Sequence, residues 1–336
     1  VRSTGFAIGR AGSRIALLKT CSPPGPADTA ANGYPVPAPM SFVDRVLDVP
    51  SYGWTLPDGS LSKPTAWQLV REAFARMNIF RSRKAWLPLT NWFWTLALAP
   101  FFVLFLVDHF SWPLAVAGFF YSMVGMGCYG TIWLHRYGTH GTYAFGGRLW
   151  RFITANLVVK VVPEEIYIIS HHVHHAKSDE PGDPYNSAGG GLYCFLADTN
   201  HQPIAKDLTR GEYARVCSMM EATGVKANTY EQYQIWGSYA HPARTTLGFL
   251  LNWSFWYGVF FLIGGHALAT ALFGSALVWA VGVRTFNFAA HGSGQDKQRA
   301  GRDFNTKDTS INQIWHGVVA GEWHNNHHLF SSSARN

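Results

Sequence analysis

The stretch His171-His172-Val173-His174-His175 determines how the rest of this sequence is interpreted. On an α-helix, residues three and four apart lie on one face, so His171, His174 and His175 are predicted to point into one volume. Converging imidazoles of this kind suit iron, zinc, copper or nickel. His172 lies about 100° further round the helix and is predicted to face elsewhere.

Three other places in the chain carry polar side chains at related spacings. His324-Asn325-Asn326-His327-His328 repeats the pattern, and His135 and His140 are five residues apart. Asn287 and His291 are four apart and share a helical face. A lone cluster could be a chance surface tract, but the four places together hold nine histidines. One zinc or iron ion takes about four to six ligands, so nine imidazoles predict two metal ions.

The composition is that of a membrane protein. Of 336 residues, 48% are hydrophobic, 15% are aromatic and only 14% are charged, whereas about 25% are charged in a typical soluble protein. The net charge of +7 suits an anionic membrane surface or an acidic redox partner. The sequence has no basic stripe with interleaved aromatic residues, so nucleic-acid binding is not expected. The four cysteines form no C-x-x-C pair, so neither a disulfide framework nor a zinc ribbon is expected, and a reduced cytosolic side is the natural interpretation.

Four apolar runs predict an all-α integral membrane protein with four transmembrane helices in two hairpins. Each run has about the 20 residues that cross a bilayer, and the tryptophans at the run ends fit an interfacial aromatic belt. Residues 108–111 and 264–267 form the two short turns. Arg284, near the end of the fourth run, is predicted to snorkel or to face the metal site. The predicted spans are residues 87–107, 112–134, 245–263 and 268–290.

The basic residues predict the orientation. They flank the spans on one side and are missing from both turns, so the positive-inside rule places both chain ends and the metal site in the cytosol. A cytosolic helical domain that carries the histidines would then cap the spans. The residues used are Arg81, Arg83, Lys84, Arg136, Arg148, Arg151 and Arg244.

Two further segments are predicted to lie at the membrane surface. Residues 152–169 carry Lys160, Pro163 and two glutamates, and a span there would put His140 and His171 on opposite sides of the membrane. We therefore expect one interfacial helix. A second helix is predicted to open near Pro64, with an apolar stripe that fits either an interfacial helix or packing on a soluble core. That stripe is Trp67, Val70, Phe74 and Met77.

The order H-x4-H, H-x2-H-H, N-x3-H, H-x2-H-H resembles the membrane fatty-acyl desaturases of the stearoyl-CoA (Δ9) type, from Trp86 to the end of the chain. The resemblance implies an O2-dependent enzyme that introduces a cis double bond into a long acyl chain, carried by CoA or by another acyl lipid. It implies two irons as the catalytic centre. It assigns nine histidines as ligands and gives Asn287 a place on one iron through water. These histidines are His135, His140, His171, His174, His175, His291, His324, His327 and His328.

Other residues complete this interpretation. Asp179 and Asp183 are candidates to orient ligand N–H groups, although both also suit simple turns. On a regular helix His135 and His140 are about 140° apart, so the helix is predicted to fray at Gly138. No His-Pro-Gly-Gly haem motif is present, so electrons are expected from a separate cytochrome b5 or ferredoxin. His201, His241 and His316 fit no cluster, and His109 and His266 lie in the two turns.

The predicted domains are a disordered segment at 1–50, an interfacial region at 51–85 and a desaturase domain at 86–336. His172 stands where the family commonly has Arg, and the third cluster is preceded by Glu322-Trp323 rather than Phe. Because of these two departures, the resemblance does not decide which group carries the acyl chain. The chain stops soon after the third cluster, so a truncated C-terminus is expected. Two alternatives remain: a membrane hydroxylase or oxygenase with the same metal core, and a metal-binding or transport protein.

Overall fold

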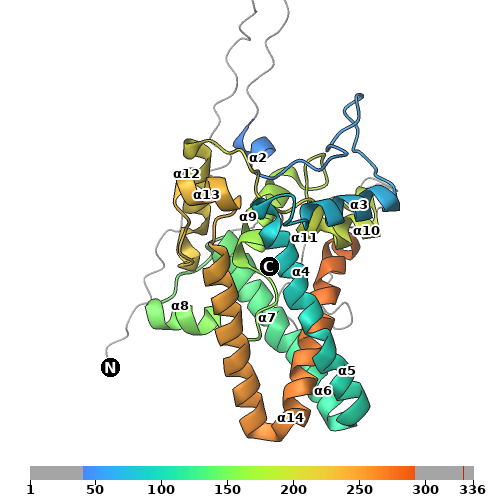
Figure 1. Cartoon of the computed structure of the whole chain (residues 1–336), viewed down its shortest axis with the longest axis vertical. Coiled ribbons are helices and arrows are strands. Elements are labelled where there is room, and N and C mark those ends of the chain that lie inside the picture. Colours follow the sequence, from blue (N-terminus) through green and yellow to red (C-terminus); the bar gives the residue numbers. More distant parts are fainter. Residues whose placement is uncertain (1–40, 292–327, 329–336) are drawn as a thin grey trace, which may run out of the picture.

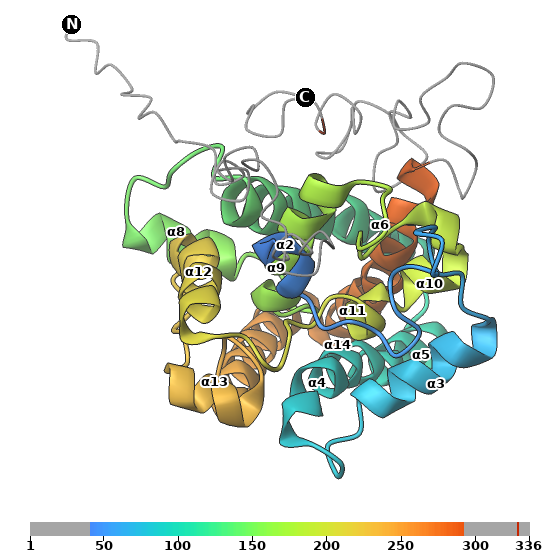
Figure 2. The same cartoon turned by 90° about the horizontal axis from the view of Figure 1, so that it is seen from above.

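The computed structural model describes residues 41–291 and residue 328, and in those residues it is helical, with three isolated β-bridges and no strand. Figures 1 and 2 show a layer of long helices beneath a layer of shorter ones. The helices are α2 (Phe42–Arg45), α3 (Ala66–Arg76), α4 (Trp86–Ala97), α5 (Ala99–Asp108), α6 (Trp112–Phe120), α7 (Gly127–Tyr129), α8 (Arg148–Ala155), α9 (Glu164–Lys177), α10 (Gly191–Phe195), α11 (Ala197–Asn200), α12 (Arg210–Met220), α13 (Tyr230–Trp236) and α14 (Pro242–Ala290). Two π-helices, η2 (Tyr121–Met126) and η3 (Gly130–Thr139), flank α7, and three short 3₁₀ turns are η1 (Arg83–Ala85), η4 (Ser187–Gly189) and η5 (Glu221–Thr223).

Three helical runs in the described residues are long and apolar enough to cross a membrane: Arg83–Asp108, Trp112–Thr139 and Pro242–Ala290. The last run, α14, is interrupted at Gly264 and Gly265, where the backbone leaves helical geometry. Gly265 has φ +67° and ψ −165°, a conformation that glycine adopts without the steric cost of a Cβ. Figure 1 shows α14 reversing direction there, so it forms a hairpin at the turn predicted for residues 264–267.

The long helices carry large apolar side chains on their outer surface. Val107 and Trp112 are each 74% exposed, and Leu262 is 84% exposed. Trp133 and Phe273 are buried between the same helices. An apolar exterior of this extent on every long helix is characteristic of a surface that is covered by something other than water.

Helix α9 packs in both layers. Its Ile169 and Val173 are buried in the core of the upper layer, whereas Ile168 and His171 contact η3 of the lower layer. That upper core also contains Phe42, Val46 and Leu47, from the segment predicted to be disordered. The prediction is therefore wrong for residues 41–50, because α2 and the chain after it bury these apolar side chains. Residues 1–40 lie outside the described part of the chain.

The prediction of one helix over residues 152–169 is also wrong. Helix α8 ends at Ala155, residues 156–163 are not helical, and α9 begins after Pro163. Proline is tolerated at a helix start but not inside one, and α14 satisfies the backbone of the non-helical stretch. Asn252 accepts from the Lys160 N–H at 2.9 Å and donates to Val158 O at 3.1 Å.

Helix α8 itself is amphipathic and buries none of its side chains. Leu149, Trp150 and Phe152 are exposed, at 66%, 62% and 66%. Part of the predicted surface segment therefore presents apolar side chains outward, whereas the part that continues into α9 is buried.

Helix α3 begins at Ala66, slightly after the start predicted near Pro64. Thr65 caps it, with its hydroxyl accepting from the Gln68 N–H and the Gln68 side chain accepting from the Thr65 N–H. Pro64 therefore precedes the cap and lies outside the first turn. The helix packs through Leu69 and its neighbours, while Trp67 and Phe74 are 72% and 69% exposed. Trp67 and Phe74 of the predicted apolar stripe therefore do not pack on the described core.

Candidate metal centre

The first pair of histidines lies at the end of the π-helix η3, with His135 inside it and His140 directly after it. The His140 N–H donates to His135 O at 3.1 Å, and this i→i+5 bond brings residues five apart to the same face. The two imidazole centroids are 5.0 Å apart. The prediction of fraying at Gly138 is thus wrong, because the helix continues through Gly138 with a wider turn.

Gly138 permits α9 to approach η3 closely. A Cβ at this position would lie 2.7 Å from Cδ1 of Ile168 and 3.0 Å from the backbone oxygen of Trp133. Because real Cβ atoms essentially never come within 3.0 Å of another heavy atom, only glycine fits without a movement of the Ile168 side chain. The close contact of these two elements brings their histidines together.

A first group of histidines combines the two elements. His135 and His140 of η3 meet His171 and His175 of α9, and one ring nitrogen from each lies within 4.8 Å of the others. The Nε2 atoms of His171 and His175 are 3.1 Å apart. All but His175 are buried. Four converging imidazoles at this spacing form a candidate metal site.

A second group lies next to the first and contains His174, His291 and His328, again with one nitrogen from each within 4.8 Å of the others. His174 comes from α9 and His291 directly follows α14. The prediction that His171, His174 and His175 share one volume therefore holds for two of them only. His174 lies about 100° from His175 round the helix, which directs it to the neighbouring group.

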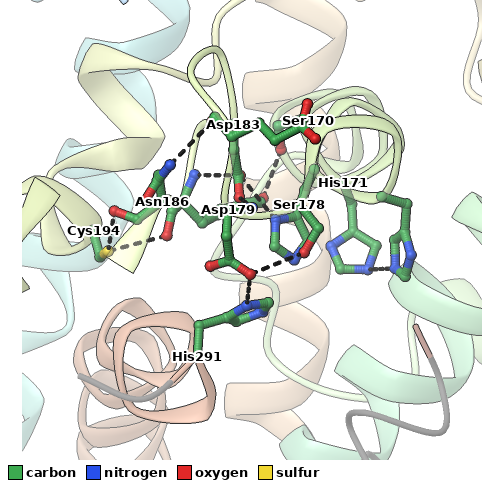
Figure 3. Close-up of polar contacts among 12 residues, drawn as sticks. Ser170, His171, Ser178, Asp179, Asp183, Asn186, Cys194 and His291 are labelled. Atoms are coloured by element: carbon green, nitrogen blue, oxygen red, sulfur yellow. Dashed lines mark hydrogen bonds and ion pairs between the residues drawn. The ribbon is translucent and has the colours of Figure 1, made fainter. Parts of the chain in front are cut away.

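Two aspartates hold the second group in place (Figure 3). Asp183 Oδ1 lies 2.8 Å from His174 Nδ1, with both side chains fully buried. Asp179 Oδ2 lies 2.9 Å from His291 Nδ1. Asp183 also accepts the Asp179 N–H at 2.8 Å, which fixes the loop at Asp179, whose φ is +61°. Both candidate orienting residues therefore contact a histidine of the second group.

His174 shows that the residues fit a metal. A carboxylate can only accept, so His174 donates its Nδ1–H to Asp183 and keeps a lone pair on Nε2. That Nε2 is buried and has no hydrogen-bond partner in the described residues. A buried polar atom without a partner is costly, and a metal ion bound by the second group would satisfy it.

A cavity of about 90 Å³ lies beside the first group. His135, His171 and Asn287 contribute to its wall, and the rest is mainly apolar, with Val161, Trp279 and Ala280 among the lining residues. Burial raises the pKa of the nearby Tyr167 and Tyr185 phenols well above their ordinary range. Both phenols therefore stay protonated beside the cavity.

Comparison with known proteins identifies the family, because the family model "Fatty acid desaturase" matches residues 110–335. The chain belongs to this family. It is 28% identical over 254 residues to Delta-9 acyl-lipid desaturase 1 of Arabidopsis thaliana, covering 71% of this chain and 69% of that one. It is 30% identical over 242 residues to the sn-1 stearoyl-lipid 9-desaturase of Anabaena variabilis, covering 69% and 77%. It is 28% identical over 233 residues to the hex-5-enoyl-[acyl-carrier protein] acetylenase of Moorena producens, covering 63% and 64%. No solved structure matches.

The remaining predicted residues of this desaturase are placed as follows. Asn287 lies one helical turn before His291, and its backbone oxygen accepts the His291 N–H at 3.1 Å. His172 is buried but belongs to neither group. His324, His327 and the unassigned His316 lie outside the described residues.

Sequence reasoning missed the partner of Arg284. The guanidinium of Arg284 forms an ion pair of 2.7 Å with Asp198, and both residues line the cavity. Asn91 donates to the same carboxylate at 2.7 Å. A basic residue inside an apolar run needs an acidic partner, and this was the available signal. The sequence does not single out Asp198 as this partner, because the polar segment that contains it has several acidic residues.

Proposed function

We propose that this desaturase holds two iron ions in the two histidine groups and uses O2 to introduce a cis double bond into a long acyl chain. The observation that carries the proposal is the division of α9 between the groups: His171 and His175 belong to one, and His174 to the other. Two adjacent sites on one helix are the arrangement that a two-metal centre requires.

The ligand sets follow from the geometry and the sequence together. His135, His140, His171 and His175 would hold one ion. The second group would hold the other, completed by His324 and His327 of the same cluster as His328, with Asn287 close by. Iron supplies the O2-derived oxidising power that removal of hydrogen from an unactivated methylene demands, which zinc does not offer.

The chain's own residues prepare the site for this chemistry. Asp183 and Asp179 fix the orientation of His174 and His291 through hydrogen bonds to Nδ1, so that Nε2 faces the site. The apolar wall of the cavity beside His135 and His171 would hold the acyl chain and exclude water.

An acyl lipid substrate is supported by two relatives that are described as an acyl-lipid and a stearoyl-lipid desaturase. The third is described as acting on hex-5-enoyl-[acyl-carrier protein], which carries a much shorter chain. We propose insertion at Δ9 of acyl-CoA or another activated acyl chain. The electrons would come from a separate cytochrome b5 or ferredoxin-type donor.

We also propose a membrane placement. The α14 hairpin forms two spans, and α4–α5 and α6–η3 form the other two. Four spans put both chain ends on the same side of the membrane, and the basic residues that flank the spans place that side in the cytosol. The exposed apolar side chains of α3 and α8 would enter the membrane surface. The candidate metal centre lies where the long helices meet the upper layer.

The function is tested by expressing the chain in a host that lacks the activity and profiling its fatty acids by gas chromatography and mass spectrometry. A new monounsaturated acid with a cis double bond is expected. A hydroxylated product of the same chain length would instead identify a lipid hydroxylase. Metal uptake without any new lipid product would favour the metal-transport alternative.

A further inference from the structure

Gln202 is a buried amide in the wall of the cavity beside the first histidine group. Its residue is only 6% exposed, and its side chain has no hydrogen-bond partner in the described residues. Two other polar side chains on that wall, Arg284 and Asp198, pair with each other. Gln202 therefore has unused hydrogen-bonding capacity at the cavity wall.

The backbone around Gln202 is held on both sides. On one side, the His201 N–H donates to Ala197 O at 2.8 Å, and the His201 ring hydrogen-bonds to the hydroxyl of Tyr52. On the other side, Pro203 O accepts the Asp48 N–H at 2.9 Å. The backbone that carries the Gln202 side chain is therefore held in place beside the cavity, as a preorganised binding group requires.

The amide of Gln202 offers two N–H donors and one acceptor. A long acyl chain presents methylenes to the cavity and has one strong polar group, the carbonyl of its ester or thioester link, which only accepts. That carbonyl is common to CoA, acyl-carrier-protein and lipid esters, so a single amide can recognise all of them.

We propose that the Gln202 side-chain amide donates a hydrogen bond to the carbonyl oxygen of the acyl link and so positions the chain in the cavity. The proposal rests on the proposed function, because it takes an acyl ester as the ligand. Since the first histidine group lines the same cavity, holding the carbonyl at a fixed point determines which methylene lies beside that group. Gln202 is thus a specificity residue for the site of the double bond.

The test compares two ligands in one detergent: methyl stearate, and methyl octadecyl ether, which lacks the carbonyl oxygen. Their affinities are measured by competition against a fluorescent long-chain probe, for the metal-loaded full chain and for Gln202→Met. We expect the native protein to bind the ester about tenfold more tightly than the ether, the typical effect of one buried hydrogen bond. In Gln202→Met the two affinities should be nearly equal.

Gln234→Met is the matched control, because Gln234 is exposed and is not among the residues that line the cavity. It should keep the native preference for the ester. If Gln202→Met is unstable, Gln202→Glu keeps the shape and removes both N–H donors, and it should also lose the preference. The double bond made by a surviving Gln202 variant should spread over neighbouring positions.

An unchanged ester preference in the folded Gln202 variants would overturn the proposal, and so would its loss in Gln234→Met. These outcomes are separate from failure of the proposed function. A native chain that yields no unsaturated product but keeps a Gln202-dependent preference for the ester would refute desaturation and support the carbonyl contact.

Discussion

Single side chains decide whether the second histidine group can hold a metal. His174 illustrates this, because its ring is fully buried and one nitrogen is already committed to Asp183. The remaining nitrogen can point only toward His291 and His328. A carboxylate behind a ligand fixes both the tautomer and the orientation of the ring.

Asp183→Asn should weaken metal binding while leaving the fold in place. The amide has almost the shape of the carboxylate, but it is uncharged and can present an N–H to His174. Loss of such an orienting partner typically costs 10- to 100-fold in metal affinity. Metal retained during titration with a chelator is the measurement. Asp207→Asn, at an exposed position, is the control, and equal retention in both variants would refute a supporting role for Asp183.

The histidines of the two groups should behave differently from those of the turns. His174→Ala and His291→Ala should each abolish formation of the unsaturated product without loss of membrane insertion. His109→Ala and His266→Ala should be nearly silent, because they lie about a membrane thickness of 30 Å from the centre in the proposed topology. Product yield per unit of membrane protein decides between these outcomes. If the turn variants were equally inactive, the histidines would act through folding.

At the scale of elements, the π-helix η3 and its contact with α9 create the first group. An α-helix would separate His135 and His140, whereas the wider turn aligns them. Gly138 then lets Ile168 pack against η3.

Gly138→Ala should destabilise the protein by about 1–3 kcal/mol, the usual cost of forcing an extra methyl into a packed site. Adding Ile168→Val removes the Cδ1 atom that the new methyl would meet and should restore part of the loss. The thermal unfolding midpoint is the measurement. Gly146→Ala, where a Cβ meets nothing within 4 Å, should be neutral. Equal effects of the two alanines would contradict the role of Gly138.

Much of the element order follows from sequence, and the exceptions have physical reasons. The long helices and the break at Gly264 were predicted because apolar runs and glycine pairs are local signals. The π-helix was not, since the same residues suit an α-helix and tertiary contact selects the wider turn. The end of α8 was missed because the backbone after it is satisfied by Asn252, nearly a hundred residues away.

For the site, spacing identified the histidines as candidates, and the resemblance to desaturases added both orienting aspartates. It could not divide the ligands between two groups, because that depends on how α9 meets η3 and the end of α14. Gln202 and Asp198 gave no periodic signal. Their place in the cavity wall follows only from the packing of the upper layer on the long helices.

At the scale of the whole molecule, the metal centre depends on where the two layers meet. The proposed four-span topology is tested with reporters fused after Asp108 and after Ala176. The first should be accessible from outside and the second from the cytosol, because the basic residues flank only the cytosolic ends of the spans. Reversed labelling of these two points would contradict the proposed placement.

The central claim is that one chain holds two metal ions in two adjacent histidine groups. It is tested most directly by the metal content of purified protein, measured by inductively coupled plasma mass spectrometry against protein concentration from amino-acid analysis. The account predicts close to two iron ions per chain, or two zinc ions if zinc is loaded during expression. A reproducible value of one ion per chain would contradict it.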